Sequence, residues 1–356
     1  MNTTPADQPP PRTSSTETVG VRSAAEILTA TGAILGPAVR TAITRLPGRI
    51  EEIAAYHCGL DVRDASRPEY GGKAIRAALT LLSCEAADGD QEQAIVAAVA
   101  VELVHHASLL HDDIIDTDRF RRARPAAWVR FGTPAALLTG DALFFLAVEL
   151  LTETGGRLAT TGVGALAKTV RDLIHGEYTD SVTNGHNTTT VAEIEAVAAA
   201  KTAVLMARAC ALGAVAAGAD DDTVTHLYRF GHHLGLAFQY TDDLLGLWGR
   251  LPRTGKPVGT DLAARRKTLP IVYALTTTSA SAGQLTDLYH SRDPLTPQQI
   301  EWGIQLVEQA GGRAWAMSRA EHHRSRALEH LDAADPARPA ATELTALADL
   351  IITRDK

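Results

Sequence analysis

The chain has 356 residues, of which 45% are hydrophobic and only 5% aromatic, and its formal net charge is −8. This length can bury one large core or two ordinary ones, and an acidic chain without a basic face argues against a nucleic-acid partner. Three scattered cysteines without metal-ligand spacing fit a reduced cytoplasmic protein and argue against structural zinc. No apolar run reaches the length expected of a membrane span, and the N-terminus lacks the pattern of a signal peptide.

The first segment differs in composition from the rest of the chain. Residues 1–22 are rich in Pro, Thr and Ser. Such a segment cannot bury enough apolar surface to offset the entropy lost when it becomes ordered. We therefore predict a disordered tail over residues 1–22 and a single all-α domain over residues 23–356.

From Ser23 onward, apolar residues recur at the helical spacing of three and four, and alanine, the strongest helix former, is frequent. The predicted helices cover Ala24–Ile43, Arg49–Tyr56, Lys73–Ala87, Gln91–Asp116, Pro134–Glu153, Ala165–Val182, Val191–Ala217, Asp221–Leu247, Thr268–Leu275, Gln299–Ala310, Gly312–Asp335 and Ala340–Arg354. No convincing strand or hairpin turn is evident in the pattern. The longest helices lack a wide polar face, which predicts one bundle with buried central helices.

Two aspartate clusters interrupt apolar stretches of this pattern, at His111–Asp116 (HDDIID) and Phe238–Gly246 (FQYTDDLLG). Asp112 and Asp116 are four residues apart and share one face of a helix. Crowded carboxylates repel one another unless a cation neutralises them, and Mg²⁺ prefers a few carboxylates together with phosphate oxygens and waters. The clusters therefore predict a site for a Mg²⁺-bound diphosphate. Solvated acidic helix ends are the alternative, but solvated charge is unexpected inside apolar runs.

Basic side chains accompany the aspartates. The segment Gly71–Arg76 (GGKAIR) places Lys73 and Arg76 one helical turn apart, after two glycines that let the backbone approach a ligand closely. A helix start that carries Lys and Arg is a ready anion site. Further candidate cations are Arg121, Arg122, Lys201, Lys256 and Lys267. Each alone is typical of a solvated surface, but together with two aspartate clusters they favour diphosphate binding.

In this order and spacing, the motifs resemble those of the trans-isoprenyl diphosphate synthases. The matching segments are GGKAIR, ELVHHASLLHDDIIDTDRFRR, GDALF, KT at Lys201, FQYTDDLLG and TGKPVGTDLAARRKTLP. The resemblance covers about residues 27–353 and is greatest to the actinobacterial branch, some of whose members are encapsulin cargo. It implies that each chain folds as an all-α isoprenoid synthase bundle around a central cavity. It also implies a cytoplasmic protein that is a homodimer. It also implies Mg²⁺-dependent head-to-tail condensation of isopentenyl diphosphate with an allylic diphosphate and, for the cargo type, docking of the tail to an encapsulin shell.

The resemblance also implies roles for individual residues. Asp112 and Asp116 would bind Mg²⁺ on the allylic diphosphate, with Asp113 in support, and Asp242 would hold a third Mg²⁺. Contacts to the allylic substrate or its leaving group would come from Arg121, Lys201, Thr202, Gln239, Lys256 and Lys267. Contacts to the diphosphate of isopentenyl diphosphate would come from Lys73, Arg76, His105 and Arg122. The chain departs from the family at Gly246, where many members have a third aspartate, so we expect a weaker metal site.

Product length depends on the side chains one helical turn before Asp112, because helix side chains lean towards the N-terminus. Ala107 and Ser108 occupy this position and are small, which favours geranylgeranyl diphosphate, with farnesyl or longer products left open. Two other functions also stay open: a class I terpene cyclase and a non-catalytic partner subunit of a prenyl synthase. A cyclase has no need of a second diphosphate pocket, so the basic residues predicted for that pocket argue against a cyclase. Partner subunits tend to lose aspartates or basic residues, and in this chain only Gly246 is a sign of such a loss.

Overall fold

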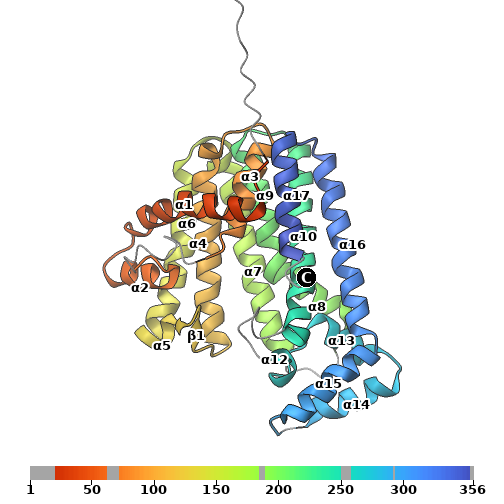
Figure 1. Cartoon of the computed structure of the whole chain (residues 1–356). Coiled ribbons are helices and arrows are strands. Elements are labelled where there is room, and N and C mark those ends of the chain that lie inside the picture. The colour runs from red at the N-terminus through yellow and green to blue at the C-terminus, as the bar shows by residue number, and fades with distance from the viewer. Residues whose placement is uncertain (1–20, 62–71, 184–188, 250–257, 292, 353–356) are drawn as a thin grey trace, which may run out of the picture.

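The computed structural model describes residues 21–61, 72–183, 189–249, 258–291 and 293–352 (Figure 1). These residues are mostly helical, which confirms the all-α prediction. The helices are α1 Ala24–Ile43, α2 Arg49–Cys58, α3 Ile75–Ala86, α4 Gln91–Ile115, α5 Ala127–Phe131, α6 Thr133–Glu153, α7 Val163–Thr183, α8 Val191–Ala198, α9 Val204–Ala216, α10 Asp221–Trp248, α12 Thr260–Ala263, α13 Leu269–Thr276, α14 Ala280–His290, α15 Pro297–Gln309, α16 Gly312–Ala333 and α17 Arg338–Ile352. Figure 1 shows α10, α16 and α17 alongside one another, with α14 and α15 at one end of the bundle.

Side-chain caps determine where helices α4 and α8 begin. Asp90 precedes α4, accepts hydrogen bonds from the first-turn backbone, and has its own backbone N–H bound by Gln93. Thr190 and Glu193 form the same reciprocal pair at the start of α8. Such a cap stabilises a helix by about 1 kcal/mol, because it satisfies N–H groups that have no partner within the helix.

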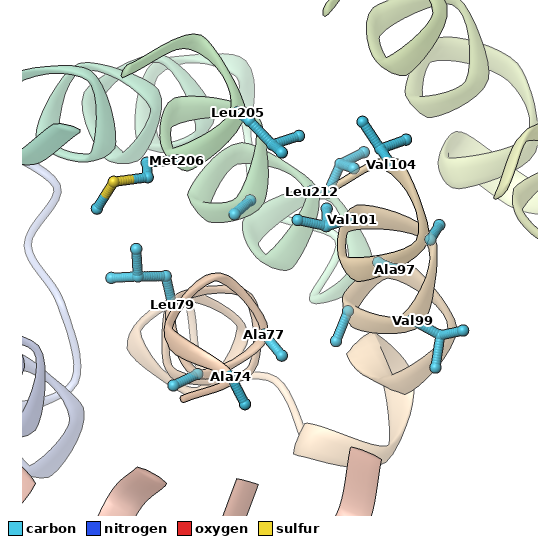
Figure 2. Packing of buried hydrophobic residues seen from close by; sticks show 14 of the residues in the cluster. Ala74, Ala77, Leu79, Ala97, Val99, Val101, Val104, Leu205, Met206 and Leu212 are labelled. Atoms are coloured by element: carbon cyan, nitrogen blue, oxygen red, sulfur yellow. The ribbon is translucent and has the colours of Figure 1, made fainter. Parts of the chain in front are cut away.

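Small side chains let the central helices approach closely. Figure 2 shows the buried contact of α3, α4 and α9, which alanine, valine and leucine side chains fill together with Met206. Any side chain at Gly213 of α9 would overlap the carbonyl oxygen of Thr80 in α3. A methyl group at Gly231 of α10 would lie only 2.6 Å from the carbonyl oxygen of Met206 in α9. Dense packing of this kind is the main source of stability, at about 25 cal/mol for each Å² of apolar surface buried.

Several elements differ from the sequence prediction, among them the short helices α5 and α12, which were not expected. A two-stranded hairpin, β1 Phe120–Arg121 with β2 Arg124–Pro125, lies where no hairpin was expected. Arg122 and Ala123 both have positive φ, as the tightest hairpin turns require, but strands of two residues carry no alternating pattern to detect. Helix α14 was also missed, because its apolar face is narrow. The predicted helix Val191–Ala217 is instead α8 and α9 joined by a π-helical turn, Ala199–Ala203.

At the N-terminus, Arg22 is bound to the bundle although we assigned it to the tail. Its backbone N–H and its Nε donate to Oε1 of Glu343 in α17, at 2.8 and 2.9 Å, and its Nη2 lies 3.1 Å from Glu85 in α3. Glu343 is only 3% exposed, whereas the side chain of Arg22 is 32% exposed, so the carboxylate is removed from water and the guanidinium only in part. The tail boundary therefore falls before Arg22. Residues 1–20 lie outside the described residues, and their disorder stays a prediction.

In the part of the chain that the structure describes, three helical stretches are long and apolar enough to cross a membrane by length and composition, contrary to our statement that no such run exists. They are α4, α6 and the continuous stretch Val191–Ala216. Burial at the centre of the bundle accounts for the apolar character of α4 and Val191–Ala216, because a buried helix is hydrophobic on all sides. Helix α6 differs, since only 39% of its apolar window is buried.

Candidate active site

The two aspartate clusters come together at one cavity of about 320 Å³, here called the polar cavity. Asp112 and Asp116 reach it from the end of α4, and Asp242 and Asp243 reach it from α10. A second cavity of about 370 Å³, here called the apolar cavity, begins beside it, and most of its exposed surface is apolar although polar side chains also line it. Asp112 lines both cavities.

Cations already neutralise the aspartates of α4. Nζ of Lys201 lies 3.1 Å from Oδ1 of Asp112, and Nη2 of Arg266 lies 3.0 Å from Oδ2 of Asp116. Burial and the neighbouring charge of Asp112 raise the pKa of Asp116, and Arg266 opposes that rise. The carboxylates and cations are therefore mutual counter-ions, and an arriving metal-bound diphosphate would exchange with both.

Lys201 is held by more acids than the sequence suggested. Its Nζ lies 2.9 Å from both Glu177 and Asp180 of α7, in addition to Asp112. Burial opposes its charge, but Asp112, Asp180 and Glu177 together raise the pKa of Lys201. The lysine stands on the π-helical turn Ala199–Ala203, a feature that is frequent at functional sites. Glu177 and Asp180 were missed because an acidic pair on a predicted helix is usually solvated.

Asp113 is turned away from the polar cavity and is 1% exposed. It accepts hydrogen bonds from Nε of Arg121 at 2.9 Å and from Nη2 of the same residue. Burial raises the pKa of Asp113, and Arg121 opposes that rise. Arg121 is thereby positioned on the hairpin, with Nη2 3.7 Å from Asp112. Asp113 therefore contacts Arg121 and does not line the polar cavity, and its supporting role stays a prediction.

The two adjacent aspartates of the second cluster differ in exposure. Asp242 is exposed towards the polar cavity, whereas Asp243 is buried. Asp243 accepts from Nε2 of Gln239 at 2.7 Å and from the backbone N–H of Leu269 at 2.8 Å, which ties α10 to the start of α13. Thr202 donates in turn to Oε1 of Gln239 at 2.7 Å. Burial raises the pKa of Asp243 to about 8, although these two hydrogen bonds favour the ionised form.

The predicted residues for isopentenyl diphosphate separate into two groups. Arg76 and His105 line the apolar cavity side by side, with Nη1 of Arg76 3.4 Å from Nε2 of His105. Burial and the charge of Arg76 lower the pKa of His105 well below its usual value, so the ring is neutral at pH 7. Lys73 and Arg122 are exposed and line neither cavity. Helix α3 begins at Ile75, two residues after the predicted start at Lys73, because Ala74 has a φ of 48°.

Two further predicted cations lie near α13. Lys267 lines the polar cavity, and its Nζ donates to Oγ1 of Thr189 at 3.2 Å. Lys256 lies outside the described residues. Asp261 and Arg266, to which we assigned no role from the sequence, line the same cavity. Their signal was present in the segment GTDLAARRK, but the pairing of Arg266 with Asp116 depends on a contact across 150 residues.

The two predicted chain-length residues face different surroundings. Ser108 lines the apolar cavity and donates to the carbonyl oxygen of His105 at 2.8 Å. Ala107 is fully buried and is not among the residues that line either cavity. It packs towards α6, where a methyl group at Gly140 would lie 3.3 Å from its carbonyl oxygen. Bulk at the apolar cavity comes instead from Phe144, Leu173, Ile174, Tyr178 and Leu205.

The donor set of the polar cavity fits a hard cation. Its acidic residues supply only carboxylate oxygens, and among the residues that the structure describes no histidine or cysteine lines it. In the described ranges, no three acidic, histidine or cysteine side chains meet closely enough to hold a metal ion by themselves. Mg²⁺ is usually bound in this incomplete way, by one or two carboxylates with substrate phosphates and waters. The residues therefore fit Mg²⁺ that arrives with a diphosphate.

Comparison with known proteins identifies the family of this chain. The sequence model of the family described as polyprenyl synthetase matches residues 66–307. A geranylgeranyl diphosphate synthase of Mycobacterium tuberculosis is 41% identical over 90% of this chain and 91% of its own length. A (2E,6E)-farnesyl diphosphate synthase of the same species is 38% identical over 90% of each chain. The crystal structure of a polyprenyl synthetase from Streptomyces coelicolor A3(2) superposes with a TM-score of 0.86 at 38% identity, covering 92% of this chain and 98% of that one. The chain thus belongs to the trans-isoprenyl diphosphate synthases of the polyprenyl synthetase family and is a prenyltransferase.

Proposed function

We propose that the protein condenses isopentenyl diphosphate with an allylic diphosphate, with Mg²⁺, to give geranylgeranyl diphosphate. One observation carries the proposal: the polar and apolar cavities adjoin and share the lining residues Arg76, Leu109, Asp112, Lys201 and Thr202. An allylic diphosphate has the same two parts, a charged head and an apolar chain. Its head fits the aspartates and cations of the polar cavity, and its chain fits the apolar cavity.

Mg²⁺, held by Asp112, Asp116 and Asp242, would supply neutralising charge to the diphosphate. Lys201, Arg266 and Arg121 would turn from their carboxylate partners to the diphosphate oxygens and stabilise the charge that develops as the bond to the allylic carbon breaks. The alkene of isopentenyl diphosphate then bonds to that carbon. A proton leaves the resulting cation to the departing diphosphate and leaves a trans double bond. The apolar cavity keeps water from the allylic cation.

Neutral His105 beside Arg76 suits the second substrate. An imidazole without charge donates one hydrogen bond to a phosphate oxygen, while the guanidinium supplies the charge. Lys73 and Arg122 would complete this diphosphate pocket, and Lys256 would join the allylic side. A second diphosphate pocket is what separates a chain-elongating enzyme from a class I terpene cyclase.

Chain length follows from the apolar cavity. Ser108 leaves room one helical turn from Asp112, and the bulkier Phe144 of α6 lines the same cavity. The named relatives make both geranylgeranyl and farnesyl diphosphate, so the family alone leaves the length undetermined. We favour geranylgeranyl diphosphate because the side chain nearest the aspartates is small.

A homodimer fits the exposed apolar side chains of α6 and α7. Phe145 is 77% exposed and Tyr178 is 65% exposed, and Leu137, Leu138 and Ile174 are exposed as well. Solvent-exposed apolar side chains on adjacent helices favour a protein partner over water. We propose that a second copy of the chain covers this face. The enzyme is proposed to be cytoplasmic, and its N-terminal tail is proposed to dock to an encapsulin shell. Light scattering of the protein with Phe145→Glu, against the exposed control Met317→Glu on α16, tests the face: only the former should yield monomers.

The decisive assay combines purified protein, Mg²⁺ and radiolabelled isopentenyl diphosphate with dimethylallyl, geranyl or farnesyl diphosphate. Chromatography of the dephosphorylated products should show a 20-carbon alcohol as the main product. Release of a cyclic hydrocarbon without incorporation of the label would instead identify a terpene cyclase. Incorporation only after a second prenyl synthase chain is added would identify a partner subunit.

A further inference from the structure

Gly246 leaves a space on the face of α10 that carries Asp242. The two residues are four apart, so a side chain at position 246 would project in the same direction as Asp242, towards the polar cavity. That space is filled by another side chain. A methyl group at Gly246 would lie 2.6 Å from Cγ of Asp261 and would overlap its Oδ2. The carboxylate of Asp261 therefore packs against the bare backbone of Gly246.

The position of Asp261 is determined by its neighbours in the short helix α12. Leu262 is fully buried in a cluster with Leu247 of α10 and Leu288 of α14. Any side chain at Gly303 of α15 would overlap Leu262, so this anchor is closely packed. The backbone N–H of Arg266 also donates to the carbonyl oxygen of Asp261 at 2.8 Å. With Leu262 fixed, its neighbour Asp261 is held against α10.

Asp261 lines the polar cavity together with Asp242, Asp116 and Arg266. We propose that Asp261 supplies the third carboxylate of the second aspartate cluster and acts with Asp242 on the same Mg²⁺, directly or through its bound waters. This inference rests on the proposed function. It replaces our expectation of a weaker metal site at Gly246, because the carboxylate is present but comes from α12. Gly246 is then required, since only a residue without a side chain admits Asp261.

Calorimetry of inorganic pyrophosphate binding at graded Mg²⁺ concentrations tests the inference without measuring catalysis. Asp261→Asn keeps the shape and removes the charge, and it should raise the Mg²⁺ concentration needed for half-maximal binding by about 10- to 100-fold. Asp287→Asn, on the exposed face of α14, is the matched control for loss of one charge and should bind as the wild type does. Gly246→Asp should bind poorly, because its carboxylate would collide with that of Asp261.

The exchange variant Gly246→Asp with Asp261→Gly returns one carboxylate to the same space from the other helix. It should restore the Mg²⁺ requirement to within about threefold of the wild type, which a purely structural role of Asp261 does not predict. Equal binding by Asp261→Asn and the wild type would overturn the inference and leave the proposed function intact. An exchange variant as weak as Asp261→Asn, with a native melting curve, would also overturn it. Absence of Mg²⁺-dependent pyrophosphate binding in the wild type would overturn the proposed function itself.

Discussion

Introducing phenylalanine at Ser108 should change the product, whereas introducing it at the adjacent Ala107 should lower the stability and leave the product unchanged. Ser108 lines the apolar cavity four residues before Asp112, which is about 6 Å along the helix and about one isoprene unit. A ring there would block the chain soon after the first condensation. We expect Ser108→Phe to shift the product from 20 carbons to 10 or 15, with Mg²⁺-dependent turnover retained.

Ala107 is fully buried on the side of α4 that packs against α6. Phenylalanine at this position overpacks the helix contact, at a cost of about 1–3 kcal/mol. For a chain of this size, that cost corresponds to a fall in melting temperature of about 1–4 °C. The folded fraction of Ala107→Phe should keep the wild-type product.

Product chromatography and thermal denaturation of both variants separate the two effects, and each variant is the control for the other. A shortened product from Ala107→Phe together with an unchanged product from Ser108→Phe would refute the reasoning. The growing chain would then pass between α4 and α6, and the apolar cavity would serve another purpose.

Other measurements test the remaining assignments. Asp112→Ala or Asp116→Ala should lower turnover by several orders of magnitude with unchanged circular dichroism, because charge stabilisation is lost in the transition state; more than about a tenth of the wild-type rate would contradict a metal role. Deleting residues 1–20 should leave turnover and melting temperature unchanged, since the bound Arg22 remains. On co-expression with an encapsulin shell, the shell should retain the full-length protein and should not retain the truncated one. Burial and the neighbouring His323 lower the pKa of His233 from 6.5 to about 4. As pH falls, the His233 ring of the unfolded chain is therefore protonated before that of the folded chain, and the stability present above about pH 6.5 is lost as pH falls towards 4. The difference in melting temperature between pH 7.5 and pH 5 should be smaller in His233→Asn than in the wild type.

The helices could be predicted from the sequence because their causes are local. Apolar spacing, abundant alanine and caps such as Asp90 with Gln93 act within one or two turns. The pairing of Asp112 with Asp116 on one face follows from helical geometry in the same way. Local signals failed where the element was short, as in the hairpin at Arg122 and Ala123, whose positive φ values leave no mark in the hydrophobic pattern.

Only the tertiary structure decided which side chains complete the site. Arg266 meets Asp116 across 150 residues, and Asp261 fills the space at Gly246 from another helix. It also decided that Ser108 borders the apolar cavity whereas Ala107 packs against α6. The physical reason is that helical periodicity defines the face of a side chain on its own helix, whereas the partner of that face depends on how all the helices pack.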